Sequence, residues 1–270
     1  MEIKLPDFKT KRNPGDYEQD GLLYCGKCKT AKQTRVNLLG TVRTVPCMCT
    51  CEQEQYEQEK AERRERERLM AIDRARHEAF QDGRMIGWTF EQDDGANARL
   101  SKTARKYAEN FNHFLSSGRG LLLYGNTGTG KTFAACCVAN KLIDDGYSVL
   151  VKNFSTIANE LLSTWDKDEY MEDLNGVSLL VLDDLDIERK SEYMQETVYS
   201  VIDSRYRSRR PLIVTTNLTL QQIQNPPDTA HARIYDRLLE MCAPVRFTGG
   251  NFRRETAQAK LERLKNLMNE

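Results

Sequence analysis

One segment of eight residues constrains the fold more than any other, because it matches the pattern G-x-x-x-x-G-K-[ST] of a phosphate-binding loop. It follows the apolar run Leu121–Tyr124, which predicts a buried strand, and precedes residues 133–142, which predict a helix. In that context the glycines let the backbone curl around phosphate oxygens, and N–H groups at the helix N-terminus face the negative charge. The residues predicted to hold the phosphates are Gly125, Asn126, Thr127, Gly128, Thr129, Gly130, Lys131 and Thr132.

Two carboxylates complete the predicted nucleotide site. Asp183 and Asp184 follow the apolar run 179–182, so they end a buried strand, which is where ligands bind in open α/β sheets. We expect Lys131 to neutralise the β- and γ-phosphates, and Thr132 and Asp183 to hold Mg²⁺. Asp184 is expected to orient or deprotonate the attacking water. The sequence therefore predicts an ATPase that uses ATP and Mg²⁺.

A third strand end adds a polar side chain. The apolar run Pro211–Val214 ends in Thr215, Thr216 and Asn217. The amide of Asn217 could hydrogen-bond the attacking water or the γ-phosphate. An ordinary strand-to-turn cap is the other interpretation, because Thr and Asn are common at such positions.

Arginines follow in three places. Arg233 and Arg237 lie one helical turn apart, and either could reach the γ-phosphate of a neighbouring subunit as a finger. Arg253 opens the last predicted helix and offers a further arginine within the same chain. The run Ser204–Arg210 is a basic patch with one aromatic residue, which suits contact with DNA phosphates or a solvated helix end.

Helices and apolar strands alternate from about residue 99 onward. Strands are predicted near residues 120–124, 147–152, 178–182, 211–215 and 244–247. Helices are predicted near residues 101–117, 131–145, 154–165, 191–208, 232–241 and 253–268. This alternation predicts an α/β fold with a five-stranded parallel sheet between helices.

Cysteines are concentrated near the N-terminus, where five of the eight fall within residues 21–51. A C-x-x-C knuckle is followed, after a gap of 18 residues, by a second group. Four thiolates in tetrahedral geometry make a closed structural Zn²⁺ site, whose metal would contribute much of the folding energy of so short a stretch. The assigned ligands are Cys25, Cys28, Cys49 and Cys51. Cys47 could replace Cys49.

Composition bounds the remaining possibilities. Residues 52–80 are dominated by Glu, Gln, Arg and Lys, which predicts a solvated helix between two modules. The expected domains are a zinc-binding module (1–51), a charged helical linker (52–84) and an ATPase domain (85–270).

The 40 acidic and 40 basic residues balance, so nucleic-acid binding must come from local patches. No apolar run is long enough for a bilayer and no signal peptide is apparent, so we expect a cytoplasmic protein with no membrane partner.

The order of GNTGTGKT, LLVLDD, IVTTNL, RIYDRLLE and GGNFR resembles the AAA+ ATPases of the DnaC/DnaI/IstB group. These are replicative-helicase loaders of bacteria and phages, and their transposon relatives. The resemblance covers about residues 85–260 and implies an AAA+ core. It also implies that Asn217 is sensor 1, Arg237 the trans-acting finger and Arg253 sensor 2. Arg233 would be an accessory interface residue or the finger itself.

Three positions depart from the pattern of that group. Asp184 stands where many AAA+ proteins have Glu, and the shorter carboxylate would suit slow hydrolysis and a switch rather than a motor. Asp186 stands where Gly is frequent, and Asn251 where Ser is common. The last two affect the expected turn and cap rather than the assignment.

The resemblance implies a loader that binds ATP·Mg²⁺, assembles with copies of itself and grips single-stranded DNA while the replicative helicase is placed at the start of DNA replication. The zinc module would dock on the helicase. Contact with single-stranded DNA is its competing role, because basic residues surround the cysteines. These residues are Lys27, Lys29, Lys32, Arg35 and Arg43. The alternatives are an IstB-like transposition helper ATPase and a zinc-dependent DNA-binding regulator that uses ATP as a ligand.

Overall fold

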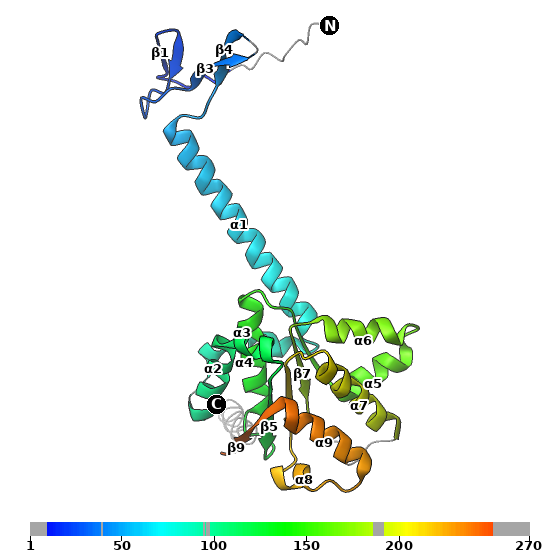
Figure 1. Ribbon diagram of the computed structural model, residues 1–270. Coiled ribbons are helices and arrows are strands. Elements are labelled where there is room, and N and C mark those ends of the chain that lie inside the picture. Colours follow the sequence, from blue (N-terminus) through cyan, green and yellow to red (C-terminus); the bar gives the residue numbers. More distant parts are fainter. Residues whose placement is uncertain (1–9, 39, 94, 96–97, 186–191, 251–270) are drawn as a thin grey trace, which may run out of the picture. The chain divides into compact units, whose positions relative to one another are not determined.

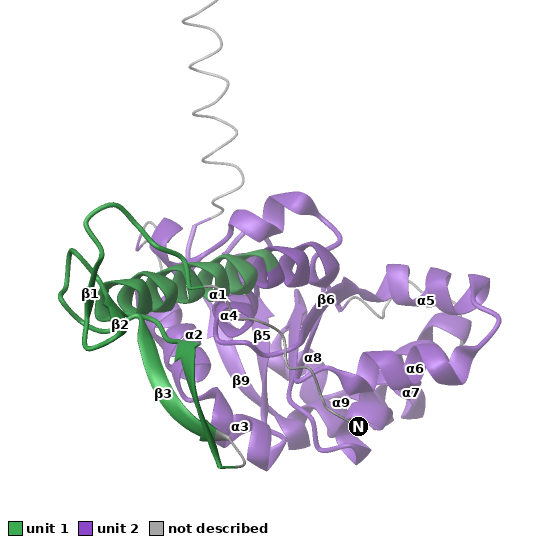
Figure 2. Ribbon diagram, turned by 90° about the horizontal axis from the view of Figure 1, so that it is seen from above, with its two compact units in different colours: residues 1–70 green, residues 71–270 purple. Residues whose placement is uncertain are grey.

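The computed structural model describes residues 10–38, 40–93, 95, 98–185 and 192–250. The chain divides into two compact units, residues 1–70 (unit 1) and 71–270 (unit 2), coloured separately in Figure 2. The boundary falls inside helix α1 (Thr50–Ala79). Among the described helices, none combines the length and the apolar character that crossing a bilayer requires.

Unit 2 is built on a five-stranded sheet of order β6-β7-β8-β5-β9, in which every neighbouring pair is parallel (Figure 1). This confirms the predicted fold. The central strands β7 and β8 bury the apolar residues Leu179–Leu182 and Leu212–Val214, as continuous apolar runs predict for strands covered on both faces. The strands are β5 (Gly120–Gly125), β6 (Val149–Asn153), β7 (Leu179–Asp183), β8 (Leu212–Thr216) and β9 (Cys242–Phe247).

Helices cover both faces of the sheet, because successive strand residues point in opposite directions. Leu121 and Leu123 pack into one apolar cluster with α2 (Ala98–Glu109), α3 (Phe111–Ser117) and α4 (Lys131–Asp144). Leu122 packs into the other. The helices on that second face are α5 (Phe154–Ser163), α6 (Lys167–Gly176), α7 (Glu192–Arg207) and α9 (Thr229–Met241). A short helix, α8 (Leu220–Gln224), also reaches it through Ile223.

The described helices differ from the prediction in three places, one of which is the short helix α8, which was not predicted. The segment 101–117 is broken at Asn110 into α2 and α3. Helix α6 was not predicted, although Asp166 caps it by accepting hydrogen bonds from two backbone N–H groups of its first turn. The predicted final helix, 253–268, lies outside the described residues, as do Asp186 and Asn251.

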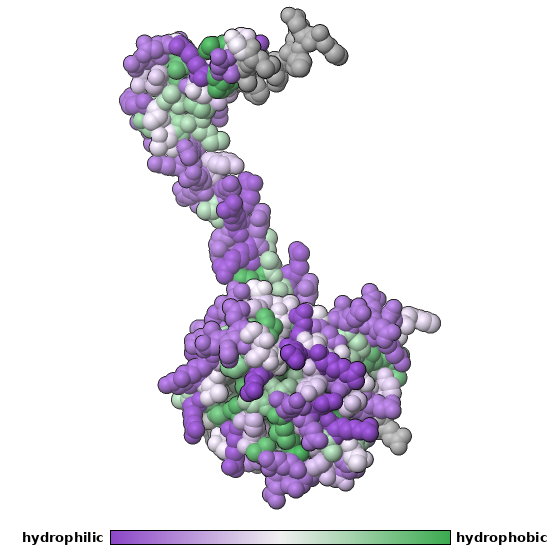
Figure 3. Space-filling view, viewed as in Figure 1, coloured by the Kyte–Doolittle hydropathy of each residue, from purple (hydrophilic) through white to green (hydrophobic). Residues whose placement is uncertain are grey.

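Unit 1 contains two antiparallel hairpins and the first part of α1. Strand β1 (Tyr17–Gln19) pairs with β2 (Leu22–Tyr24), and β3 (Gln33–Leu38) pairs with β4 (Thr41–Pro46). Among its described residues only Leu23, Cys25, Lys32 and Cys49 are buried. Helix α1 is the solvated helix that the sequence predicted, and Figure 3 shows a mostly hydrophilic surface along it.

The basic run 204–210 contains a buried arginine, so neither interpretation of that run fits Arg205. Its guanidinium is fully buried and donates to backbone carbonyl oxygens at the end of α6 and before β8. Nη1 lies 3.0 Å from the oxygen of Val177 and 3.3 Å from those of Leu174 and Asn175, and Nη2 donates to that of Pro211. Burial lowers the pKa of Arg205 to about 9. Arg205 therefore joins two connections of the fold.

Replacing Arg205 with methionine should destabilise unit 2 by about 3 kcal/mol or more, because several carbonyl oxygens would stay buried without a donor. Urea unfolding followed by fluorescence measures the change. Arg207→Ala is the matched control, because Arg207 is exposed on the same helix and its loss should move the midpoint far less. Equal midpoints for Arg205→Met and wild type would contradict the structural role.

Candidate functional site

The predicted phosphate-binding loop connects the end of β5 to the start of α4, at the carboxyl end of the sheet. Gly125 has φ +132°, and a Cβ there would lie 2.2 Å from the backbone oxygen of Phe247 on β9. Gly130, directly before α4, has φ +91° and open space where its Cβ would be. Both glycines are thus needed for the backbone path, which leaves room beside the helix N-terminus for an anion.

Lys131 is buried within this loop, at 7% exposure. Its Nζ donates to the backbone oxygens of Gly125 and Asn126, both at 2.8 Å, and to Oδ1 of Asn217 at 3.0 Å. The residue is therefore largely removed from water, and its ammonium donates to these three uncharged oxygens. Phosphate oxygens would be stronger acceptors for the same hydrogens.

Thr132 and Asp183, the predicted magnesium ligands, are brought together by the fold. The Thr132 hydroxyl donates to Oδ1 of Asp183 at 2.8 Å. Asp183 ends β7 and Thr132 lies in the first turn of α4, so the contact joins the loop to the neighbouring strand end. A hydroxyl and a carboxylate oxygen are hard ligands of the kind that Mg²⁺ takes, usually with several waters. These two residues fit a magnesium ion.

Asp184 and Asn217 also lie beside one another. The Nδ2 atom of Asn217 donates to Oδ1 of Asp184 at 3.1 Å, while its Oδ1 accepts from Lys131. The amide thus bridges the ammonium and the exposed carboxylate. Asp184 has φ +58°, a left-handed conformation that residues other than glycine adopt rarely and that is frequent at functional sites.

Thr215 was missed as a site residue. Its hydroxyl donates to Oδ1 of Asp183 at 2.6 Å and accepts from the backbone N–H of Asp184 at 2.8 Å, so it fixes both acids. Thr216 makes a similar link, donating to the backbone oxygen of Leu185 at 2.7 Å. The signal in the sequence was a pair of threonines at the end of a strand next to the one that carries the aspartates.

Thr215→Val should lower ATP turnover about tenfold, because supporting hydrogen bonds to metal ligands typically contribute 10- to 100-fold. Steady-state phosphate release measures this. Thr215→Ser keeps the hydroxyl and should recover most of the rate, which separates the hydrogen bonds from the loss of packing. Equal rates for the valine and serine variants would show that the hydroxyl does not act on the aspartates.

The predicted arginines have different surroundings. Arg237, on α9, bonds through Nε to Oδ1 of Asp203 at 3.3 Å. Arg233, one turn earlier, is exposed and makes no hydrogen bond or ion pair with the described part of the chain. Arg253, the predicted sensor 2, lies outside the described residues.

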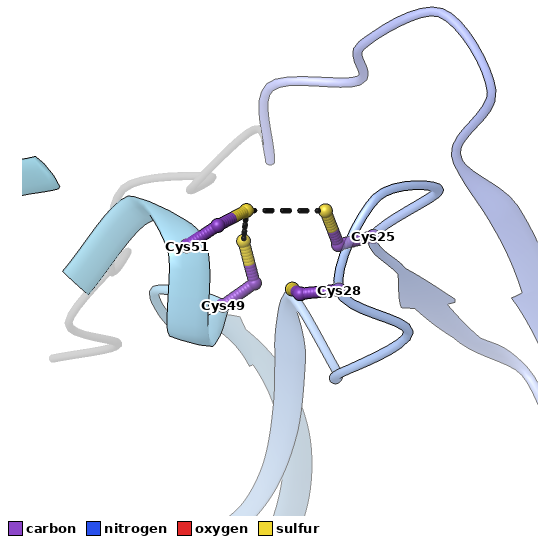
Figure 4. Close-up of side chains that lie close together, drawn as sticks. All are labelled: Cys25, Cys28, Cys49 and Cys51. Atoms are coloured by element: carbon purple, nitrogen blue, oxygen red, sulfur yellow. Dashed lines mark hydrogen bonds between the residues drawn. The ribbon is translucent and has the colours of Figure 1, made fainter. Parts of the chain in front are cut away.

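The second candidate site is the cysteine cluster of unit 1. The Sγ atoms of Cys25, Cys28, Cys49 and Cys51 all lie within 4.8 Å of one another and point toward a common centre (Figure 4). The Cys25–Cys51 and Cys49–Cys51 sulfurs are 3.6 and 3.4 Å apart. These separations are too long for disulfides, and a Zn–S bond of about 2.3 Å gives about 3.8 Å along a tetrahedral edge. The donor set fits zinc.

Cys47, the alternative ligand, is not part of this cluster. Its Sγ lies 3.5 Å from the backbone oxygen of Ala31. The knuckle itself is fixed by Gly26, whose N–H donates to Oδ1 of Asp16 at 3.0 Å. A Cβ on Gly26 would lie 2.2 Å from the backbone oxygen of Gly15, so the C-G-K-C sequence needs its glycine.

Hydrogen bonds favour the thiolate form in part of the cluster. They lower the pKa of Cys28 to about 5, first through the Thr30 hydroxyl and then through the backbone N–H of Cys51. Backbone N–H groups of Cys28 and Lys27 lower the pKa of Cys25. Burial raises the pKa of Cys49, and a divalent cation held by these sulfurs would oppose that effect, because metal coordination favours the thiolate.

Two of the curated proteins that this chain resembles are named as replicative helicase loaders. The replicative helicase loader DnaI of Bacillus subtilis (strain 168) is 26% identical over 185 residues, which is 63% of this chain and 59% of that protein. The replicative helicase loader DnaC of Escherichia coli (strain K12) is 30% identical over 135 residues, or 48% of this chain and 54% of that protein. The chain thus spans less than two thirds of either relative.

Two solved crystal structures are similar in fold to this chain. A crystal structure of DnaI has a TM-score of 0.54 at 22% identity, covering 66% of this chain and 99% of that one. A crystal structure of the DnaC helicase loader has a TM-score of 0.53 at 23% identity, covering 62% and 100%. The family model described as "IstB-like ATP binding protein" matches residues 50–260. The chain belongs to the family of IstB-like ATP-binding proteins.

Proposed function

We propose that this protein is an ATP-dependent loader of the replicative DNA helicase. The observation that carries the proposal is the polar network at the carboxyl end of the sheet, in which Lys131, Asn217 and Asp184 form a continuous chain of contacts. The relatives named as helicase loaders supply the biological setting. Binding of ATP would exchange the carbonyl partners of Lys131 for phosphate oxygens and so alter the network.

Each residue of the network has a proposed role. Lys131 and the loop N–H groups bind the phosphates, and Thr132 and Asp183 hold Mg²⁺, which supplies charge neutralisation for phosphoryl transfer. Asp184 accepts a hydrogen bond from the attacking water. Asn217 positions Asp184 relative to the γ-phosphate through its hydrogen bond to that carboxylate. An aspartate in this role is one carbon shorter than glutamate, which suits a slow ATPase that acts as a switch.

The arginines extend the proposed site to a neighbouring copy of the chain. Arg237 or Arg233 reaches the γ-phosphate of ATP bound by that copy, so hydrolysis requires a homo-oligomer. An arginine finger is worth 10³- to 10⁵-fold in turnover in other phosphoryl-transfer enzymes. Arg253 is proposed to contact the nucleotide within its own chain.

The cysteine cluster is proposed to bind Zn²⁺ and to shape a surface that docks on the helicase. Contact with single-stranded DNA is the competing role for the same unit. Tyr17 and Tyr24 stack at 5.7 Å, and Nζ of Lys29 lies 5.3 Å from the centre of the Tyr17 ring. Aromatic rings beside cations are a common arrangement for single-stranded nucleic acids.

Size-exclusion chromatography with light scattering tests the proposal. The full chain is mixed with the replicative helicase of the same cell, with ATP, with ADP or without nucleotide, and with or without single-stranded DNA. We expect a loader–helicase complex whose mass depends on ATP. The absence of a complex under every condition would contradict the loader role, whereas a complex with a transposase instead would identify a transposition helper.

A second measurement separates the loader from a regulator that only binds ATP. Asp184→Asn should lower turnover at least tenfold while ATP affinity stays within a few-fold of wild type. Equal turnover in the variant and the wild type, together with binding to double-stranded DNA, would favour the zinc-dependent regulator.

A further inference from the structure

Helix α7 carries a buried acid, Asp203, that contacts two arginines. Its side chain is 9% exposed, and its Oδ2 lies 2.7 Å from Nε of Arg207 on the same helix. Its Oδ1 lies 3.3 Å from Nε of Arg237 on α9. Glu240 is a second acid beside this group, because its Oε2 lies 3.9 Å from Nη1 of Arg237. Two carboxylates thus balance the two arginines, and a phosphate would be recognised through the geometry of Arg237 rather than through an excess of positive charge.

Arg237 is held on more than one side. The guanidinium carbon lies 4.2 Å from the centre of the Tyr206 ring, so one face of the guanidinium stacks on that ring. The Tyr206 hydroxyl in turn donates to Oε1 of Glu240 at 2.6 Å, which fixes the ring. The contacts with Asp203 and Tyr206 thus define both the position and the plane of the guanidinium.

The opposite edge of the same guanidinium is less engaged. Nη1 lies 3.9 Å from Oε2 of Glu240, which is longer than a hydrogen bond, and the side chain is 36% exposed. Arginine binds phosphate best through two parallel N–H groups, so an anchored Nε and an accessible terminal edge suit phosphate recognition. An unrestrained arginine would lose rotamer entropy on binding, and the contacts with Asp203 and Tyr206 mean that part of that loss has already occurred here.

We propose that Asp203 and Tyr206 are positioning residues that hold Arg237 ready to meet the γ-phosphate of ATP bound by a second copy of this chain. The inference rests on the proposed function, because it assumes that the chain hydrolyses ATP and that Arg237 acts in trans. It adds that α7 sets the geometry of the finger. It also separates Arg237 from Arg233, which is exposed and makes no such contacts among the described residues.

ATP turnover and ATP affinity of single variants give the first test. Arg237→Ala should lose about 10³-fold in kcat. Asp203→Asn should lose 10- to 100-fold in kcat with unchanged ATP affinity, a typical effect of a residue that orients a catalytic group. Glu196→Gln makes the same chemical change at an exposed position of α7 and should match wild type. In Arg237→Ala, adding Asp203→Asn should cause no further loss, because the residue through which it acts is gone.

Subunit mixing distinguishes positioning from a general structural effect. Lys131→Ala copies lack the nucleotide site but keep Arg237, and Asp203→Asn copies keep the nucleotide site. A mixture of the two should turn over ATP at least severalfold faster than the sum of the separate variants. If Arg237→Ala copies are rescued in this way and Asp203→Asn copies are not, or if Asp203→Asn alone matches wild type, the inference is wrong. Wild-type activity in Arg237→Ala would instead overturn the trans finger of the proposed function, and the inference with it.

Discussion

Replacing Lys131 with alanine should abolish the thermal stabilisation that ATP and Mg²⁺ give to the wild-type protein. At a concentration of ATP 100 times its Kd, binding adds about 2.7 kcal/mol to the stability of the folded state. For a unit of this size that corresponds to a rise in Tm of about 5–10 °C. We expect a rise of this order for wild type and none for Lys131→Ala, measured by differential scanning fluorimetry of the full chain with and without ATP·Mg²⁺.

The expected loss of ATP affinity depends on the contacts that Lys131 makes before the nucleotide binds. Lys131 is 7% exposed and its Nζ already donates to three uncharged oxygens, so binding does not have to remove the ammonium from water. Binding exchanges these partners for charged phosphate oxygens, which are stronger acceptors, and hydrogen bonds to charged groups contribute about 1.5–3 kcal/mol each. Loss of even two of them lowers affinity by more than 100-fold.

Lys141 offers a matched control on the same helix. Its Nζ lies 2.7 Å from Oδ2 of Asp145, at the end of α4 away from the loop, and the pair is exposed. Lys141→Ala removes the same charge but should keep the ATP-induced rise in Tm. A full rise in Lys131→Ala would mean that the loop does not bind the phosphates through this lysine.

Much of the sheet and of the polar network at its carboxyl end was predictable, because both follow from apolar runs that end in polar residues. Asp183 and Asn217 were placed at strand ends, and parallel strands bring such ends to one edge. The order of the strands in the sheet was harder to predict from the sequence. Asn217 contacts Lys131 because β8 lies between β5 and β7, a neighbourhood set by long-range pairing rather than by any local pattern.

The features that escaped prediction share a dependence on distant partners. From the sequence, Arg205 is expected to be exposed, because it lies in a basic run. It is buried in the structure because carbonyl groups near residues 174–177 and 211 accept its hydrogen bonds. From the sequence, Thr215 is an ordinary strand residue, and its contact with the carboxylate of Asp183 is evident only in the folded structure. Helix α6 is polar, with Leu174 as its one buried residue in the structure described, so it lacks the periodic apolar face that predicts a helix.

Replacing Cys49 with alanine should abolish the proposed zinc binding of unit 1 and unfold its two hairpins, whereas Cys47→Ala should do neither. Wild type and Cys47→Ala are expected to contain about one zinc per chain, and Cys49→Ala close to none, by elemental analysis of the purified full chain. The contrast is sharp because the two cysteines lie two residues apart, yet only Cys49 belongs to the sulfur cluster.

We expect the hairpins to unfold when zinc is lost, because few other interactions stabilise them. Within the described residues of unit 1 the buried apolar side chains are Leu23 and two of the cysteines, far too little apolar area to offset the conformational entropy of about forty ordered residues. Structural zinc contributes about 10–16 kcal/mol in comparable small modules. The buried pair of Lys32 and Asp16 adds specificity rather than a compensating stability, since buried ion pairs bear a desolvation cost.

Hydrogen exchange read by mass spectrometry gives the structural readout of this prediction. Amides of β1 to β4 should exchange rapidly in Cys49→Ala and slowly in Cys47→Ala and wild type. The ATP-induced rise in Tm of unit 2 should be the same in all three, because none of the residues that form the nucleotide network lies in unit 1. Protected hairpins in a metal-free Cys49→Ala protein would show that the fold of unit 1 does not depend on the cluster, and the zinc assignment would then lose its physical basis.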